Sequence, residues 1–279
     1  MTVSLPFANR VPLDAAERQA LLSFACSAIS SAGRQALPFF RSSMVVSNKD
    51  QGAGFDPVTE ADRAVEEDLR NAIAQAFPEH GILGEEYGLT GGNGLTWVID
   101  PIDGTRAFMS GLLHWGVLLG LFDGQRAVLG ALYQPVTDEL FWGDGAAAWY
   151  RRGAEPAMAL QVQASDSLKE SIVATSWSGF FERTERQAGF SSLALGARLM
   201  HLQGDCYLYG LLAMGQLQVV LDGGLSPYDI LPLIPIIQGA GGVVVGGDGN
   251  DPQTGGFIVA AASQSLADAA LDTVNHQRS

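Results

Sequence analysis

Two apolar runs joined by a tight-turn signal place the strongest constraint on how this chain can fold. Residues 115–122 and 126–133 are apolar enough to form buried strands, and Asp123-Gly124 lies between them. This dipeptide favours the backbone of a short hairpin turn. Shorter runs follow at 140–142 and 146–150, with glycine between them. The pattern therefore predicts an antiparallel meander in the middle of the chain.

Two amphipathic helices are predicted before this sheet. Residues 15–40 carry apolar side chains at three- and four-residue spacing, and Asp14 with Glu17 resembles a capping box ahead of them. A second helix is expected to begin at Thr59 and to end before Pro78, because proline cannot continue the helical hydrogen bonds.

The remainder of the chain mixes helices and strands. Residues 151–156, Arg-Arg-Gly-Ala-Glu-Pro, mark a plausible boundary. We predict an N-terminal α+β half, residues 1–152, and a C-terminal α/β half, residues 153–279. In the second half, strands are expected at 172–175, 217–221, 243–245 and 257–260, and helices at 207–214, 229–238 and 265–276.

The composition indicates a well-packed globular protein and excludes several functions. Hydrophobic residues make up 47% of the chain and charged residues 16%. The net charge of −14 is wrong for a nucleic-acid polymer as partner, since binding phosphates needs excess Lys and Arg. It is compatible with a small anionic substrate, because divalent cations reverse the local field.

The two cysteines and the apolar segments bear on location. Cys26 and Cys206 are far apart and match neither a disulfide framework nor a zinc-binding spacing, which favours reduced thiols. We find no signal-peptide pattern and no apolar stretch near the ~18 residues of a membrane span. The expected location is the cytoplasm, without membrane contact.

The strongest chemical signal is Asp100-Pro101-Ile102-Asp103-Gly104-Thr105. An apolar strand precedes Asp100, and Pro101 with Gly104 can bend the chain so that both carboxylates face one point. Hard divalent cations prefer such oxygen ligands, and the Ile102 carbonyl can add another. Taken alone, the fragment also fits an ordinary turn.

Three further acidic positions strengthen this reading. Glu85 follows a predicted strand end in Gly84-Glu85-Glu86, Asp62 lies in the first turn of the second helix, and Asp229 precedes an apolar segment. Singly, each has a plainer explanation. Glu85 fits a solvated surface pair, Asp62 a helix cap, and Asp229 a partner of a helix dipole.

Together the motifs resemble the inositol monophosphatase family of lithium-sensitive, magnesium-dependent phosphatases. The resemblance runs from the first helix to about residue 245. It implies a layered α/β sandwich of the inositol monophosphatase / fructose-1,6-bisphosphatase type, with the metal site between the two halves. The matching segments are 57–62, 84–86, 97–105 with Phe108, 227–229 and 239–242.

The resemblance also implies residue roles. Asp62 and Thr105 look like the pair that orients and deprotonates the attacking water, and Lys49 matches an upstream family lysine. Gly104 and Thr105 would hold phosphate through their backbone N–H groups. The ligands of two or three Mg²⁺ ions would be the side chains of Glu85, Asp100, Asp103 and Asp229 and the carbonyl of Ile102.

Within the family, the chain is most similar to the histidinol-phosphatase-like branch. The segments 100–111 and 204–207 carry this similarity. It implies that Asp205 lines the substrate pocket, and Asp222 occupies a position where other members place a substrate-binding acid. Arg198 and Asp229 complete the expected substrate set. Three departures put the substrate in question, namely His114, His201 and the segment 243–247.

The implied activity is the hydrolysis of histidinol phosphate, a step of histidine biosynthesis, by a cytoplasmic, lithium-sensitive homodimer. One alternative is the same chemistry on inositol 1-phosphate, a sugar bisphosphate or a 3′-phosphonucleotide. Another is a catalytically idle metal-binding relative with a regulatory role. The presence of Asp62, Glu85 and Thr105 favours an enzyme, because an idle relative would be free to lose them.

Overall fold

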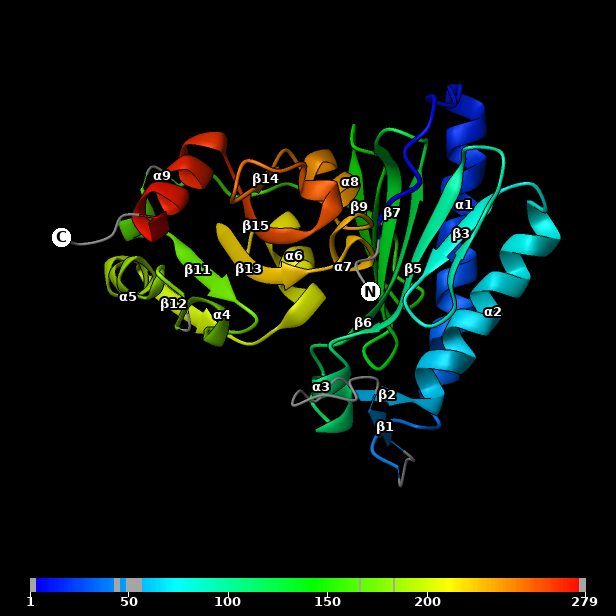
Figure 1. The fold of residues 1–279 in the computed structure, drawn as a ribbon, viewed down its shortest axis with the longest axis horizontal. Helices are drawn as coiled ribbons and strands as arrows, with labels where there is room; N and C mark the ends of the chain where they lie inside the picture. The colour runs from blue at the N-terminus through cyan, green and yellow to red at the C-terminus, as the bar shows by residue number, and fades with distance from the viewer. Residues whose placement is uncertain (1–3, 43–45, 49–56, 166, 183, 276–279) are drawn as a thin grey trace.

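An eight-stranded sheet forms the centre of the protein. The computed structural model describes residues 4–42, 46–48, 57–165, 167–182 and 184–275. The strand order is β10-β9-β8-β7-β6-β5-β3-β4, and Figure 1 labels β9, β7, β6, β5 and β3 of this sheet. These strands are β3 (Gly81–Gly84), β4 (Gly88–Thr90), β5 (Thr96–Asp103), β6 (Gly116–Phe122), β7 (Ala127–Gln134), β8 (Glu139–Gly143), β9 (Ala148–Arg152) and β10 (Met158–Ala159).

The predicted meander is confirmed. Strands β5 to β10 follow one another in the sheet, and each pairs antiparallel with the next. The sheet is mixed rather than purely antiparallel, because β3 pairs parallel with β5. A small separate pair, β1 (Val46–Asn48) and β2 (Pro57–Thr59), leads into the second helix.

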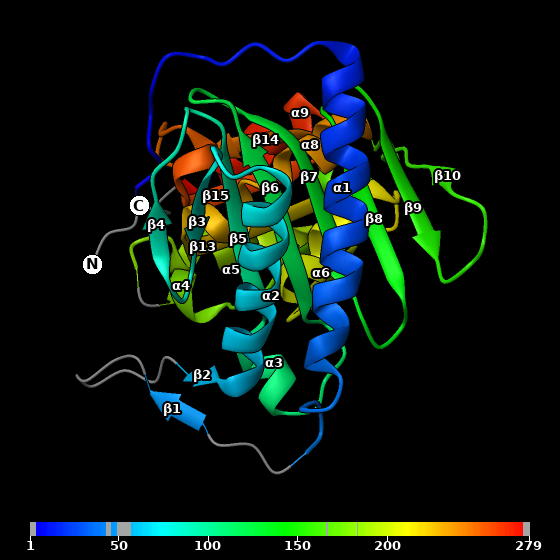
Figure 2. The same cartoon turned by 90° about the vertical axis from the view of Figure 1, so that its right-hand side faces the viewer.

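Helices α1 (Ala15–Gly33) and α2 (Glu60–Ala76) cover one face of the large sheet, as Figure 2 shows. Their apolar stripes, which include Ile29 and Leu69, pack against Trp97, Ile99 and other buried residues of the sheet. Alternation along β5 places Val98 in a different apolar cluster, on the opposite face. Both helices have the capping boxes that their sequences indicate.

The first helix is shorter than predicted. It ends at Gly33 and continues as a single 3₁₀ turn, Arg34–Ala36. A Cβ at Gly33 would lie 2.7 Å from Cδ1 of Tyr133 on β7. The last residue of α1 therefore approaches the sheet closely, a contact that local spacing does not reveal.

A second, five-stranded sheet has the order β12-β11-β13-β15-β14. Helices α6 and α8 lie between the two sheets, and α5 and α9 cover the outer face, which gives alternating helix and sheet layers (Figure 1). The strands are β11 (Ile172–Thr175), β12 (Leu199–Leu202), β13 (Val219–Leu225), β14 (Val243–Gly246) and β15 (Gly256–Ala261), and the helices are α3 (Thr105–Met109), α4 (Gly179–Glu182), α5 (Gln187–Gly196), α6 (Asp205–Ala213), α7 (Pro227–Ile230), α8 (Ile234–Gly239) and α9 (Gln264–Asn275), with 3₁₀ turns at Leu168–Glu170 and Pro252–Thr254.

The helix predicted at 229–238 is two helices instead. Helix α7 begins at Pro227 and ends at Ile230, and α8 begins at Ile234. Pro232 lies in the gap between them, and a proline can supply no N–H to the preceding turn. Asp229 consequently lies inside the first turn of a short helix rather than ahead of a long one.

The layered α/β fold expected from the sequence is confirmed. The first sheet continues to Ala159, and the second begins at Ile172, so the exchange between sheets follows the expected boundary region. Residues of both halves share one apolar cluster between the sheets. The division at residue 152 stays a prediction. Among the described residues, no helix has the length and apolar character to cross a membrane.

Candidate active site

Asp100 and Asp103 both come from the end of β5, where a bulge resets the alternation of side chains. Residues three apart on a regular strand point to opposite faces. Here the register against β6 shifts, so that Asp100 pairs with Leu118 and Asp103 with Gly116. One extra residue on β5 brings the second carboxylate back to the side of the first. Pro101 suits this irregularity, because it has no N–H for the ladder.

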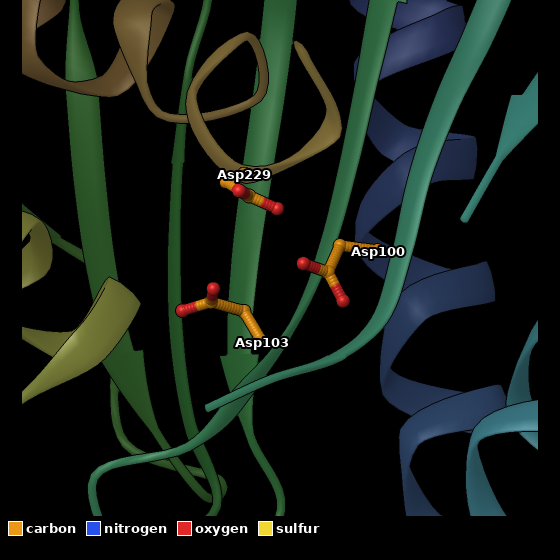
Figure 3. Close-up of side chains that lie close together, drawn as sticks. All are labelled: Asp100, Asp103 and Asp229. Carbon is orange, nitrogen blue, oxygen red and sulfur yellow. The ribbon is translucent and has the colours of Figure 1, made fainter. Parts of the chain in front are cut away.

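Asp229 reaches the same point from the second half of the chain. It lies in α7, where Ser226 is the N-cap and its N–H donates to Oδ2 of Asp229 at 2.7 Å. The carboxylates of Asp100, Asp103 and Asp229 each offer an oxygen, and these oxygens lie within 4.8 Å of one another. Figure 3 shows the three side chains facing a common space.

Burial and mutual repulsion make these carboxylates hard to ionise without a cation. Burial raises the pKa of Asp100 well above its usual range, and the charges of Glu85, Asp103 and Asp229 raise it further. Burial likewise raises the pKa of Asp103, together with the charges of Asp205 and Asp229. A divalent cation would relieve this repulsion, and an oxygen-only donor set fits Mg²⁺.

Two more predicted ligands lie next to this group. Glu85 follows β3, and its N–H donates to the carbonyl of Ile99 at 3.3 Å. Its charge acts on Asp100, as the raised pKa of Asp100 shows. Ile102 is buried in the bulge, where its N–H donates to Oδ1 of Asp100 at 3.1 Å. Its carbonyl accepts from the Thr105 hydroxyl at 3.0 Å and keeps a second lone pair.

Gly104 and Thr105 begin the five-residue helix α3. Gly104 is the N-cap and has a φ of 84°, which favours glycine. A Cβ there would lie only 2.9 Å from Oδ2 of Asp205. The backbone conformation and the nearness of Asp205 therefore both require glycine at this position.

Asp62 is completely buried in the first turn of α2. Its Oδ2 accepts a hydrogen bond from the N–H of Thr59 at 2.8 Å and a second one from the Thr59 hydroxyl. This is the capping role that its position in the sequence indicates, and its part in activating water stays a prediction. Lys49 lies outside the described residues.

Asp205 lies between the three aspartates and a larger cavity. It lines a small pocket of about 50 Å³ together with Asp103 and Asp229. It also lines an adjoining cavity of about 280 Å³ together with His114 and Arg106. Nδ1 of His114 lies 2.8 Å from Oδ2 of Asp205, and this hydrogen bond raises the pKa of His114. The cavity beside the metal-ligand candidates therefore has one carboxylate, Asp205, together with two basic side chains, His114 and Arg106.

Asp222 is a buried anchor on the other side of the small pocket. Its oxygens accept hydrogen bonds from the hydroxyl of Thr175 at 3.0 Å, from Ser176 N–H at 2.6 Å and hydroxyl at 3.0 Å, and from Tyr209 at 2.9 Å. Burial raises the pKa of Asp222 to about 6, although these bonds oppose the rise. With four donors around it, Asp222 fixes the second sheet against α6.

The structure does not bring every predicted site residue to this place. Arg198 lines a separate cavity with Lys169 and Gln218, next to Ser171 at the start of β11. Asp222 contacts the opposite end of that strand. His201 is exposed on β12, and residues 243–246 form strand β14.

Four residues that sequence reasoning missed line the larger cavity. Ser176 and Trp177 follow β11 directly, Gln203 follows β12, and Arg106 lies in α3. Cζ of Arg106 lies 6.0 Å from the ring centroid of Trp177. A usable signal was present, because polar and aromatic residues directly after a buried strand often face a ligand in open α/β sheets.

Comparison with known proteins identifies the family of this chain. A sequence profile of the inositol monophosphatase family matches residues 17–278. The histidinol-phosphatase of Chlorobaculum parvum is 34% identical over 224 residues, covering 79% of this chain and 83% of that protein. The histidinol-phosphatase of Mycobacterium tuberculosis is 32% identical over 223 residues, covering 78% of this chain and 85% of that protein.

A solved structure shows the same architecture. An inositol monophosphatase from Zymomonas mobilis matches with a TM-score of 0.80 and 32% identity, covering 95% of this chain and 100% of that one. The family profile and the solved structure both match nearly the whole length of the chain, and the converging aspartates lie within the matched region. The chain belongs to the inositol monophosphatase family, whose members are metal-dependent phosphatases.

Proposed function

We propose that this protein is a Mg²⁺-dependent phosphomonoesterase whose substrate is histidinol phosphate. The observation that carries the proposal is the convergence of Asp100, Asp103 and Asp229, with ligand oxygens within 4.8 Å of one another. A cavity of about 280 Å³ adjoins them, and Asp205 on its wall offers a carboxylate to a small phosphorylated molecule that carries a cation. The similarity to histidinol-phosphatases points to the same substrate.

The metal ions would be held by oxygen atoms only. When bound, two or three Mg²⁺ ions would supply charge stabilisation to the phosphoryl group and lower the pKa of a water. The proposed ligands are the carboxylates of Glu85, Asp100, Asp103 and Asp229 and the carbonyl of Ile102, which lies in the bulge of β5.

Asp62 and Thr105 are proposed to orient the attacking water and to accept its proton, and the family resemblance adds Lys49 to the catalytic set. The backbone N–H groups of Gly104 and Thr105 would hold phosphate oxygens. These two residues lie at the start of α3, where N–H groups lack helical partners. Phosphoryl transfer requires mainly positioning and electrostatic stabilisation, and no covalent nucleophile is needed.

The leaving alcohol would lie in the larger cavity. A protonated amine or imidazole of histidinol phosphate would face Asp205, whose carboxylate is otherwise held by His114. Trp177 offers an aromatic face on the same cavity wall. Asp222 supports the pocket through its hydrogen bonds, and Arg198 contacts a different cavity, so we assign neither a direct substrate contact in this chain.

A substrate panel distinguishes the proposal from its alternatives. Phosphate release with Mg²⁺ should be compared for histidinol phosphate, inositol 1-phosphate, fructose 1,6-bisphosphate and a 3′-phosphonucleotide. We expect kcat/KM for histidinol phosphate to exceed the others by about tenfold or more, the scale of a charge-assisted contact. A clear preference for one of the other three compounds would reject this substrate while leaving the chemistry intact. Absence of turnover on all of them would favour an idle regulatory relative.

Assembly and location form the last part of the proposal. We propose a cytoplasmic homodimer, as most closed assemblies of one chain are twofold symmetric. Light scattering at micromolar concentration tests the dimer, because a particle with the mass of a single chain would reject it.

A further inference from the structure

Glu66 connects helix α2 to the turn that carries Glu85. The Glu66 side chain is completely buried, although it is a carboxylate. Its Oε2 accepts the N–H of Glu86 at 2.7 Å, and its Oε1 accepts the N–H of Tyr87 at 3.2 Å. These two residues directly follow Glu85 in the turn between β3 and β4. A carboxylate that binds two successive backbone N–H groups fixes the path of the chain there.

Arg70, one turn further along α2, completes the connection. Its Nε donates to Oε1 of Glu66 at 2.7 Å, and its Nη2 donates to the carbonyl of Gly88. Its Nη1 donates to the hydroxyl of Thr90 at 3.2 Å, and its Cζ lies 5.8 Å from the ring centroid of Tyr87. One guanidinium therefore balances the buried charge of Glu66 and holds the β4 side of the turn.

The residue before Glu85 leaves room for this contact. A Cβ on Gly84 would lie 1.9 Å from Oε1 of Glu66. A side chain at this position would displace the carboxylate from the two N–H groups. The glycine in Gly84-Glu85-Glu86 is thus explained by the approach of Glu66.

We propose that Glu66 and Arg70 are positioning residues that hold the metal ligand Glu85 in place, an inference that rests on the metal role proposed for Glu85. Glu85 lies on a short turn near the edge of the large sheet, whereas Asp100 and Asp103 lie on a central strand. Pairing with β5 holds the start of this turn through the N–H of Glu85, and Glu66 on α2 holds the two residues that follow. A metal site depends on ligands held close to their working geometry, and the side chains that orient them are themselves needed for affinity.

The test measures Mg²⁺ binding directly, by calorimetry on the full-length protein without substrate. We expect Glu66→Gln and Arg70→Gln to raise the apparent Kd for Mg²⁺ by about tenfold. This is the lower end of the loss of affinity caused by removing such supporting residues. Arg70→Lys should fall between wild type and Arg70→Gln, because one ammonium cannot bond Glu66, Gly88 and Thr90 together. Glu67→Gln is the matched control, since Glu67 is the next residue on α2 and is exposed, and its Kd should not change.

Kinetics provide a second readout that a merely structural defect would not move. In both variants the Mg²⁺ concentration for half-maximal rate should rise about tenfold, while kcat at saturating Mg²⁺ should stay within about threefold of wild type. If Glu66→Gln does not fold, Arg70→Gln carries the test, because the Arg70 side chain already reaches the surface.

Glu85→Gln separates the possible failures. If it weakens Mg²⁺ binding while Glu66→Gln and Arg70→Gln bind like wild type, the positioning role is wrong and the proposed ligand set stands. If Glu85→Gln also binds Mg²⁺ like wild type, the metal role of Glu85 and this inference are both wrong.

Discussion

Nδ1 of His114 lies 2.8 Å from Oδ2 of Asp205, at the border between the metal-ligand candidates and the larger cavity. About a quarter of each side chain remains exposed, 24% for His114 and 28% for Asp205. A cationic substrate approaching Asp205 would therefore meet a carboxylate that already has a partner. Whether His114 is charged decides how much negative charge remains for the substrate.

This relationship predicts a pH dependence of substrate binding. The pKa of His114 is raised, so the charged form persists above the usual value of about 6.5. As pH rises through the raised pKa, His114 becomes neutral and KM for histidinol phosphate should fall. In His114→Gln, KM should be lower at acidic pH and change less over the same range. Comparing wild type with His114→Gln removes the effect of the substrate's own titration, because both proteins bind the same substrate. Identical pH profiles of KM for the two proteins would contradict the proposed effect of His114.

Asp205 itself should matter for cationic substrates only. Asp205→Asn should raise KM for histidinol phosphate by about tenfold, the effect of losing one charge-assisted contact. The control is hydrolysis, by the same variant, of a sugar monophosphate whose alcohol carries no charge. Its KM should barely change. An equal loss on both substrates would show that Asp205 supports the structure of the site rather than its selectivity.

His80 should make stability depend on pH. Burial lowers the pKa of His80. Its Nδ1 accepts a hydrogen bond from the indole Nε1–H of Trp97 at 3.1 Å, as a neutral imidazole can. Below about pH 6.5, His80 of the unfolded chain binds a proton that His80 of the folded protein resists. The free energy of unfolding that neutral His80 contributes is therefore lost as pH falls through the lowered pKa. Denaturant unfolding at pH 5 and pH 7.5 should show a smaller difference for His80→Gln than for wild type. Equal differences would exclude His80 as a cause.

Lithium should inhibit the enzyme at millimolar concentration. Li⁺ can take a weakly held metal position without supplying the charge of Mg²⁺. Rates measured at fixed Mg²⁺ with increasing Li⁺, and with K⁺ as the ionic-strength control, check this expectation. Unchanged rates at a large excess of Li⁺ would remove lithium sensitivity from the account.

Local sequence signals sufficed where an element is determined by its own residues. The hairpin at Asp123-Gly124, strand β11 and the capping box at Thr59 all follow from turn chemistry, periodicity and capping. Asp100 and Asp103 were also found this way, because the Asp100–Thr105 turn is compact and chemically distinctive, whereas the roles of Glu85 and Asp229 came from the family resemblance.

Other features depend on contacts between distant segments. The close approach of Gly33 to Tyr133 joins α1 to β7, and the burial of Glu66 depends on Gly84 and on a turn twenty residues away. The short strands β4, β10 and β12 pair through tertiary context rather than through long apolar runs. Arg198 illustrates the same limit, since similarity of position did not show that it faces a different cavity.

Metal dependence tests the central claim most directly. Phosphate release from histidinol phosphate should disappear when a chelator removes divalent cations and return when Mg²⁺ is added. Asp103→Asn keeps the shape of a carboxylate but removes one charge from the group, and should reduce the restored activity by about a hundredfold or more. Hydrolysis that survives the chelator, or full activity of Asp103→Asn in trace-metal-free Mg²⁺ buffer, would contradict the account.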